Sequence, residues 1–226
     1  MKREASIIVV LGLFFFAQAA QADWTPAKRL TWTSGSSSQP AVAIGSNDTI
    51  HVVWHDYTPG NAEIYYKRST NGGTTWSAAK RLSWTSGGSK GQAIALDPSD
   101  TLHLVWYDDT PGNQEVYYRR SADGGATWSA VKRLTWTSGD SCYPAIATGS
   151  ISGIHVVWRD DTPGDREIYY KRSADGGATW GGKERLTWNA GDSYSPAIAI
   201  DSANTIHIVW NDYAPVDSEI YYRNGM

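Results

Sequence analysis

The residues of this sequence best suited to bind a ligand are tryptophans and carboxylates that return at a fixed spacing. Four polar loops each contain a Trp, and four acidic loops each begin with an Asp. These residues are Trp32, Trp84, Trp136 and Trp188, and Asp56, Asp108, Asp160 and Asp212. An aromatic ring can stack on the C–H face of a sugar, and a carboxylate can accept hydrogen bonds from its hydroxyls. The pattern therefore indicates a carbohydrate-binding surface.

The same Asp residues also have a purely structural interpretation. Asp56 is followed by Pro59-Gly60 and then by Glu63. Asp and Pro-Gly are frequent in turns, where the carboxylate accepts backbone hydrogen bonds. The acidic loops can therefore be binding elements or simply well-capped turns, and the sequence leaves both open.

Two arginines stand at positions where the four loops differ. Arg159 aligns with His55, Tyr107 and Asn211, and Arg166 with Ala62, Gln114 and Ser218. A guanidinium recognises a carboxylate with paired hydrogen bonds. We therefore include Arg159 and Arg166 among the candidate ligand-binding residues, for an acidic sugar.

The loop Trp and Asp residues belong to a repeat of 52 residues. Trp24, Trp76, Trp128 and Trp180 are each 52 residues apart, and every other Trp belongs to the same period. A strict long period is typical of stacked or radial units rather than of one irregular core.

Each unit contains four short segments with β-strand character. In the first unit they are residues 24–30, 40–44, 50–54 and 64–66, separated by turn residues, and no segment has sustained helical periodicity. Four strands in about 52 residues match the size of a β-propeller blade. We predict an all-β propeller of about four four-stranded blades over residues 23–226.

The turn between units carries a recognisable octet. Residues 121–128 and 173–180 both read Ser-Ala-Asp-Gly-Gly-Ala-Thr-Trp, and residues 69–76 are a close variant. The octet resembles the Asp box, or BNR repeat, of sialidases and related β-propellers, whose pattern is Ser-x-Asp-x-Gly-x-Thr-Trp. In that family the box is a structural turn away from the active site, so the resemblance implies a fold rather than an activity.

The sialidase resemblance also suggests what to look for in an active site. That family uses three arginines, a Tyr–Glu pair and an acidic Asp, and carries a Phe/Tyr-Arg-Ile-Pro motif near its start. The motif does not occur in this sequence. We therefore assign no catalytic residue.

The phase of the repeat suggests how the ring closes. The first unit begins with an outermost strand, residues 24–30, and the last unit stops after its third, residues 220–222. The N-terminal strand could complete the last blade and hide its edge. We expect a monomer closed by its own first strand; the alternative is a larger ring that needs a second chain, for example a dimer closed in trans.

The N-terminus has the features of a secretory signal peptide. Lys2 and Arg3 precede an apolar run, residues 7–16, and a small-residue stretch that ends at Ala22. We predict cleavage after Ala22, a secreted or periplasmic protein, and no membrane span after cleavage. The single Cys142 excludes an internal disulfide, and the net charge of −3 argues against a nucleic-acid partner.

Two further repeated residue types have simple structural interpretations. The strand and octet Trp residues, such as Trp54 and Trp76, are expected to fill space between blades. One His per unit (His51, His103, His155 and His207) lies in an apolar strand. We expect hydrogen-bonded structural histidines rather than a metal ring, and no cofactor.

Three functions remain open. The leading hypothesis is a secreted, non-catalytic, lectin-like or partner-binding propeller whose partner is an extracellular glycan or protein. The second is a sialidase-type glycoside hydrolase. The third is a structural protein-docking propeller, or a truncated copy of a larger one.

Overall fold

The computed structural model describes residues 24–149, 153–213 and 217–226, and they contain strands and turns only. No helix in this part of the chain could cross a membrane. The predicted signal peptide, residues 1–22, lies outside the described residues. The chain divides into two units, residues 1–30 and 31–226, and all the sheets belong to the second.

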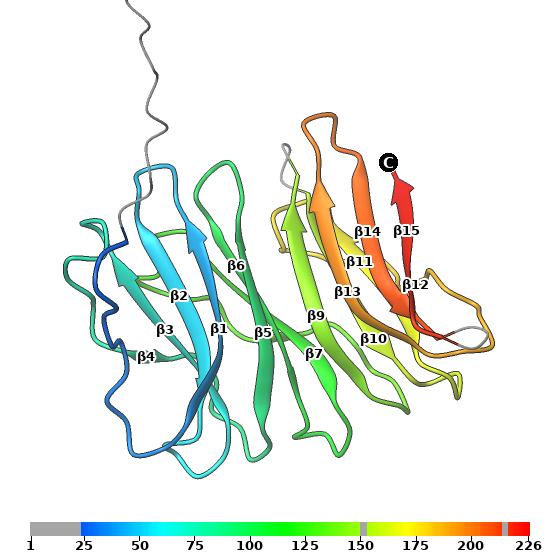
Figure 1. Ribbon diagram of the computed structural model, residues 1–226, viewed down its shortest axis with the longest axis horizontal. Coiled ribbons are helices and arrows are strands. Elements are labelled where there is room, and N and C mark those ends of the chain that lie inside the picture. Colours follow the sequence, from blue (N-terminus) through cyan, green and yellow to red (C-terminus); the bar gives the residue numbers. More distant parts are fainter. Residues whose placement is uncertain (1–23, 150–152, 214–216) are drawn as a thin grey trace, which may run out of the picture. The chain divides into compact units, whose positions relative to one another are not determined.

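Four antiparallel sheets follow one another along the chain, as the repeat predicts (Figure 1). The first contains β1 (Ser37–Ile44), β2 (Ile50–Asp56), β3 (Glu63–Ser69) and β4 (Lys80–Arg81). The second contains β5 (Ser89–Leu96), β6 (Leu102–Asp108), β7 (Glu115–Ser121) and β8 (Lys132–Arg133). The third contains β9 (Ser141–Thr148), β10 (Ile154–Asp160), β11 (Glu167–Ser173) and β12 (Glu184–Arg185). The fourth contains β13 (Ser193–Ile200), β14 (Ile206–Asp212) and β15 (Glu219–Gly225).

The sheets share one register. In the first sheet Asp56 pairs with Glu63, and Trp54 pairs with Tyr65, and the later sheets repeat these pairs. The inner strands β1, β5, β9 and β13 each carry a bulge near their start. The bulge residues Gln39, Gly91, Tyr143 and Ser195 all have positive φ, between 49° and 61°. The four bulges therefore share one unusual backbone conformation.

Apolar residues from neighbouring sheets form the core. One cluster joins Ile64 and Tyr66 of the first sheet to Leu104 and Trp106 of the second. Equivalent clusters join the second sheet to the third and the third to the fourth. The strand tryptophans pack in these joints, as expected, and Trp106 is 1% exposed. Each joint therefore buries the faces of two sheets at once.

The octet forms the predicted side-chain-capped turn. Asp123 Oδ1 accepts a hydrogen bond from the Thr127 N–H at 2.8 Å, and Ser121 Oγ accepts one from the Gly125 N–H at 2.8 Å. Gly124 and Gly125 have φ values of 62° and 85°, which favour glycine. The octet Trp then packs edge-on against the preceding sheet, with 5.3 Å between the ring centres of Trp128 and Tyr66.

The strand histidines are hydrogen-bonded to tyrosines, as predicted. The Nδ1 atoms of His51, His103, His155 and His207 lie 2.7–2.8 Å from the hydroxyls of Tyr66, Tyr118, Tyr170 and Tyr222. Each bond joins the second and third strands of a sheet. The histidines therefore belong to the scaffold.

The outermost strands are shorter than predicted. The expected strand at residues 76–82 shrinks to Lys80–Arg81, because this segment contacts β3 mainly near its two ends. Ser77 N donates to Arg68 O at 2.9 Å, and Leu82 N donates to Ile64 O at 2.7 Å. Residues 24–30 carry no strand, and the fourth sheet has three strands in the described chain. Closure by the N-terminal strand is therefore not observed and stays a prediction.

Candidate functional site

The four loop tryptophans are largely exposed. Trp32, Trp84, Trp136 and Trp188 are 62–68% exposed, whereas the strand tryptophans are at most 6% exposed. The loop Trp is therefore exposed to a similar extent in all four repeats. An exposed aromatic side chain at the same place in every repeat offers a flat apolar surface on which a ligand could stack.

Basic side chains lie over these rings. The guanidinium of Arg133 lies 5.6 Å from the centre of the Trp136 ring, and Lys171 Nζ of the next sheet lies 5.7 Å from it. Trp84 and Trp188 have the same contact with Arg81 and Arg185. Lys67 lies 5.6 Å from the Trp32 ring. These cation–π contacts limit the orientations of each ring.

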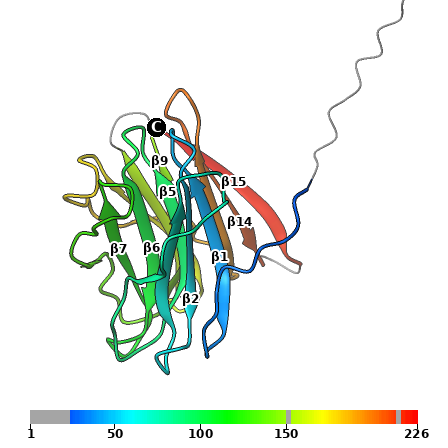
Figure 2. The same ribbon diagram turned by 90° about the vertical axis from the view of Figure 1, so that its left-hand side faces the viewer.

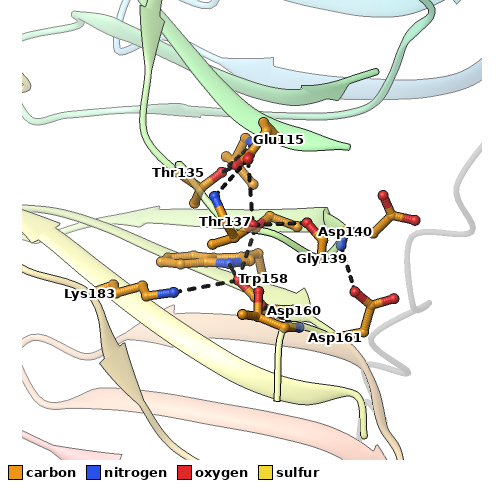
Figure 3. Close-up of polar contacts among 12 residues, drawn as sticks. Glu115, Thr135, Thr137, Gly139, Asp140, Trp158, Asp160, Asp161 and Lys183 are labelled. Carbon is orange, nitrogen blue, oxygen red and sulfur yellow. Dashed lines mark hydrogen bonds and ion pairs between the residues drawn. The ribbon is translucent and has the colours of Figure 1, made fainter. Parts of the chain in front are cut away.

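Buried carboxylates hold the residues on both sides of Trp84 and Trp136 and the residue before Trp188. Figure 3 shows the contacts of Glu115, the carboxylate beside Trp136. Glu115 is fully buried; it accepts hydrogen bonds from Arg133 Nη2 at 2.7 Å and from the Thr137 N–H at 2.8 Å. The Thr135 hydroxyl also donates to Glu115. Thr135 and Thr137 flank Trp136, so one carboxylate clamps the loop that presents this ring. Glu63 and Glu167 hold Arg81 and Arg185 in the same way.

The predicted ligand-binding aspartates hold the same loops from the other side. Asp56, Asp108, Asp160 and Asp212 are at most 1% exposed. Asp108 accepts hydrogen bonds from Thr85 Oγ1 at 2.8 Å, Ser89 Oγ at 2.5 Å and the Thr110 N–H at 2.8 Å. Thr85 follows Trp84, so Asp108 connects the acidic loop to the Trp loop. The structure matches the turn-capping interpretation of these residues, because their oxygens face the protein rather than solvent.

Hydrogen bonds to Asp56 also favour the charged form of its carboxylate. Burial raises the pKa of Asp56, but hydrogen bonds from Ser37 and Thr58 outweigh it and hold that pKa below its ordinary value. Asp56 is therefore ionised at neutral pH and acts as an acceptor. It has neither the access nor the proton that a general acid needs.

The two unrepeated arginines lie in an aromatic cluster. The Arg159 guanidinium lies 5.1 Å from the ring centre of Tyr143 and 5.6 Å from that of Tyr194. The Arg166 guanidinium lies 5.2 Å from the ring centre of Tyr194, and Arg166 pairs with Asp192, with 2.9 Å between Nη1 and Oδ2. The structure therefore brings Arg159 and Arg166 together through Tyr194.

Sequence reasoning missed the tyrosines of this cluster. Tyr143 is 47% exposed and packs against Tyr107, with 5.5 Å between ring centres. Tyr143 and Tyr194 align with residues of other types in the other repeats, such as Gln39 and Ser38. The loss of repetition at the starts of the inner strands was the available signal.

Cys142 lies beneath the cluster and is not a nucleophile. It is fully buried, and Arg159 Nη2 donates to its Sγ at 2.9 Å. Burial raises the pKa of the thiol to about 11, so it is protonated at neutral pH. Its role is packing.

The four bulges line a shallow cavity. Gln39, Gly91, Tyr143 and Ser195, one from each inner strand, border a cavity of about 350 Å³. Within the described residues no group of three or more His, Cys, Asp or Glu is arranged to hold a metal ion. The surface therefore offers two candidate elements: the repeated Trp loops and the unrepeated cluster beside this cavity.

Comparison with known proteins defines the family. The model of the BNR repeat-like domain matches residues 5–218, and the chain belongs to this family. No curated protein matches the sequence significantly.

Solved structures share the fold at low sequence identity. A protein of unknown function from Dyadobacter fermentans is 14% identical with a TM-score of 0.68, over 85% of this chain and 66% of its own. An α-L-arabinanase from Penicillium chrysogenum, complexed with arabinobiose, is 16% identical with a TM-score of 0.63, over 84% and 62%. The NanB sialidase of Streptococcus pneumoniae, as a K499G mutant, is 16% identical with a TM-score of 0.53, over 80% and 29%. The chain thus spans less than two thirds of these three structures, and the fold is that of sialidase-like and arabinanase β-propellers.

Proposed function

We propose that this protein is a carbohydrate-binding β-propeller that uses its four loop tryptophans as repeated sugar platforms. One observation carries the proposal: the same Trp is more than 60% exposed in every repeat. A sugar ring that stacks on such an indole removes apolar surface from water.

The rigidity of the loops supports this role. Glu115 holds the residues on either side of Trp136, and Arg133 packs on the ring. A platform fixed before binding loses little conformational entropy when a ligand arrives. Four such platforms on one chain also offer multivalent binding to a polysaccharide.

The similar structures support glycans as the ligand class. They include the arabinanase bound to arabinobiose and an α-L-arabinofuranosidase from Fusarium graminearum with an iminosugar inhibitor. An exported protein would meet such polymers outside the cell, and the predicted signal peptide agrees with this location.

Affinity electrophoresis in gels that contain soluble arabinan or a sialylated glycoprotein tests the proposal. We expect retention of the protein and a loss of at least tenfold in apparent affinity, about 1.4 kcal/mol, for Trp84→Ala combined with Trp136→Ala. The matched control is Val131→Ala, which truncates a side chain that is 45% exposed on another loop. Equal retention of all three proteins, or none with a broad panel of glycans, would contradict the proposal.

A sialidase-type hydrolase is the second candidate, and the cluster of Arg159, Arg166, Tyr143 and Tyr194 favours it. An active site needs different groups that converge on one substrate, and here residues that differ between the repeats contact one another. Release of a fluorophore from a sialoside or an arabinoside, abolished by Arg159→Ala, would establish this activity. Binding without turnover would leave the first proposal standing and remove the second.

A further inference from the structure

The last sheet exposes a face that the other sheets bury. Ile220 and Tyr222 on β15 are 69% and 56% exposed, whereas Ile64, Val116 and Ile168, the counterparts of Ile220, are fully buried. Among the described residues β15 has one ladder partner, β14, so its other long edge is unpaired there (Figure 1). An uncovered apolar strand edge favours the addition of another strand.

The first sheet, which faces the viewer in Figure 2, also carries exposed apolar residues, on its innermost strand β1. Val42 and Ile44 on β1 are 63% and 62% exposed. Their counterparts on β5, Ile94 and Leu96, pack against the core cluster that joins the first and second sheets. The first sheet thus carries the surface that the second, third and fourth sheets use to contact the sheet before them.

The joints between sheets show how these two faces fit. The Tyr66 hydroxyl donates to Gly124 O at 3.1 Å, and the Tyr66 ring packs on Trp128 of the next octet. Tyr118 and Trp180 repeat the ring contact at 5.1 Å. The joint is directional: the third strand of one sheet contacts the octet turn of the next.

The last sheet has an exposed third strand, and the first sheet has an octet turn, so together they carry both elements of this joint. Tyr222 is the counterpart of Tyr66, and the first octet has Gly73 where the second has Gly125. A Cβ built on Gly125 would overlap Tyr66, whereas one built on Gly73 has nothing closer than 3.9 Å. A Tyr ring could therefore approach Gly73 without the overlap that a Cβ on Gly125 would have with Tyr66.

We propose that two copies of this chain associate head to tail, so that the last sheet of each packs on the first sheet of the other. The two joints are identical by symmetry, and four sheets from each copy give a ring of eight, within the usual range for propellers. Both end faces are exposed in residues 31–226, and the second copy would cover them.

The N-terminal segment of the second copy supplies the missing strand. Residues 28–30 read Lys-Arg-Leu, as do residues 80–82 and 132–134. In the first sheet Tyr66 pairs with Lys80 and Tyr65 pairs with Arg81. The same register pairs Tyr222 with Lys28, and Tyr221 with Arg29, of the second copy.

Charge and shape support the N-terminal segment of the second copy as the added strand. Arg81 pairs with Glu63 at 2.7 Å, and the equivalent carboxylate of the fourth sheet, Glu219, is exposed. Arg29 of the second copy has the charge to pair with it. A cavity of about 230 Å³, bordered by Tyr170, Leu186 and Arg223, lies where Trp24 of the second copy would pack on Tyr170, as Trp128 packs on Tyr66.

Disulfide trapping between two different single-cysteine variants tests the proposal directly. Lys28→Cys and Tyr222→Cys are made separately in a Cys142→Ser background, mixed and oxidised. Facing Cα atoms in an antiparallel ladder lie about 4.5–5.5 Å apart, within disulfide range. We expect a cross-linked dimer from the mixture and none when Val131→Cys replaces Tyr222→Cys.

Light scattering after size exclusion provides the second readout. We expect twice the chain mass for the parent protein and for Val131→Arg, and the mass of one chain for Tyr222→Arg. A monomeric parent, or an intrachain disulfide in the Lys28→Cys/Tyr222→Cys double variant with no cross-linked dimer, would overturn the proposal in favour of self-closure. A trimer or larger assembly would overturn the two-chain ring.

Discussion

Glu115 and Arg133 form an ion pair, with 2.7 Å between Oε1 and Nη2, on the two strands that precede Trp136. The carboxylate is fully buried, whereas the guanidinium is 25% exposed and extends over the Trp136 ring. The pair therefore connects the sheet interior to an exposed aromatic surface. Its counterparts are Glu63–Arg81 and Glu167–Arg185.

We expect Glu115→Gln to lower the free energy of unfolding by about 2–3 kcal/mol, because it leaves a buried site with fewer acceptors and an unpaired Arg133. Urea denaturation measures the change. Glu184→Gln, the same substitution at an exposed position of β12, should change stability by less than about 0.5 kcal/mol. Equal effects of the two substitutions would show that the clamp does not stabilise the fold.

The joint between sheets predicts unequal costs for two equivalent glycine substitutions. Gly73 and Gly125 have φ values of 80° and 85°, so Ala strains the backbone at both. Only at Gly125 does the new Cβ also overlap Tyr66. We expect Gly125→Ala to cost about 1–3 kcal/mol more than Gly73→Ala. Urea denaturation in a Tyr222→Arg background compares them without association, and equal costs would refute the close contact.

The buried histidines predict a loss of stability in mild acid. Burial, with a smaller contribution from Arg172, lowers the pKa of His155 to about 4 from an ordinary value of 6.5. The unfolded chain then binds a proton more readily than the folded one, so stability is full above pH 6.5 and falls as the pH drops towards 4. The loss from this residue is about 3 kcal/mol.

His155→Gln removes this titration and leaves a side chain that can still hydrogen-bond to Tyr170. We expect a smaller fall in the free energy of unfolding between pH 7 and pH 4.5 than in the parent protein. Guanidinium denaturation at the two pH values checks this. Parallel pH profiles for parent and variant would mean that His155 is not a neutral buried group.

The octets predict which substitution of Asp123 is tolerated. Hydrogen bonds from the Thr127 hydroxyl and N–H hold the pKa of Asp123 at about 2, so its stabilising effect is complete above about pH 3.8 and is lost as the pH falls through 2. Asn71 makes the equivalent bond in the first octet, at 2.9 Å from the Thr75 N–H. At pH 7 we expect Asp123→Asn to unfold near the parent temperature and Asp123→Ala clearly below it. Calorimetry compares them, and a tolerated Ala would show that the acceptor is dispensable.

The repeat made much of the fold predictable, since the period of Trp24, Trp76, Trp128 and Trp180 locates every sheet. The strand or loop position of each Trp correctly separated Trp54, which is 3% exposed, from Trp32, which is 68% exposed. The burial of Asp108 was not predictable, because its donors, Thr85 and Ser89, come from the loop before β5 and from the first residue of β5. The contact of Arg159 with Tyr143 depends on the bulge of β9, which local sequence does not reveal.

The directional joint has a consequence for how such genes change length. Because Tyr66 and Tyr118 meet the following octet in the same way, any unit can follow any other without a new interface. Unequal recombination that adds or deletes one 52-residue unit would leave every remaining joint chemically intact. Blade number can therefore drift between descendants of one ancestor, while the unrepeated cluster at Arg159 and Tyr194 would be the part that such an exchange disrupts.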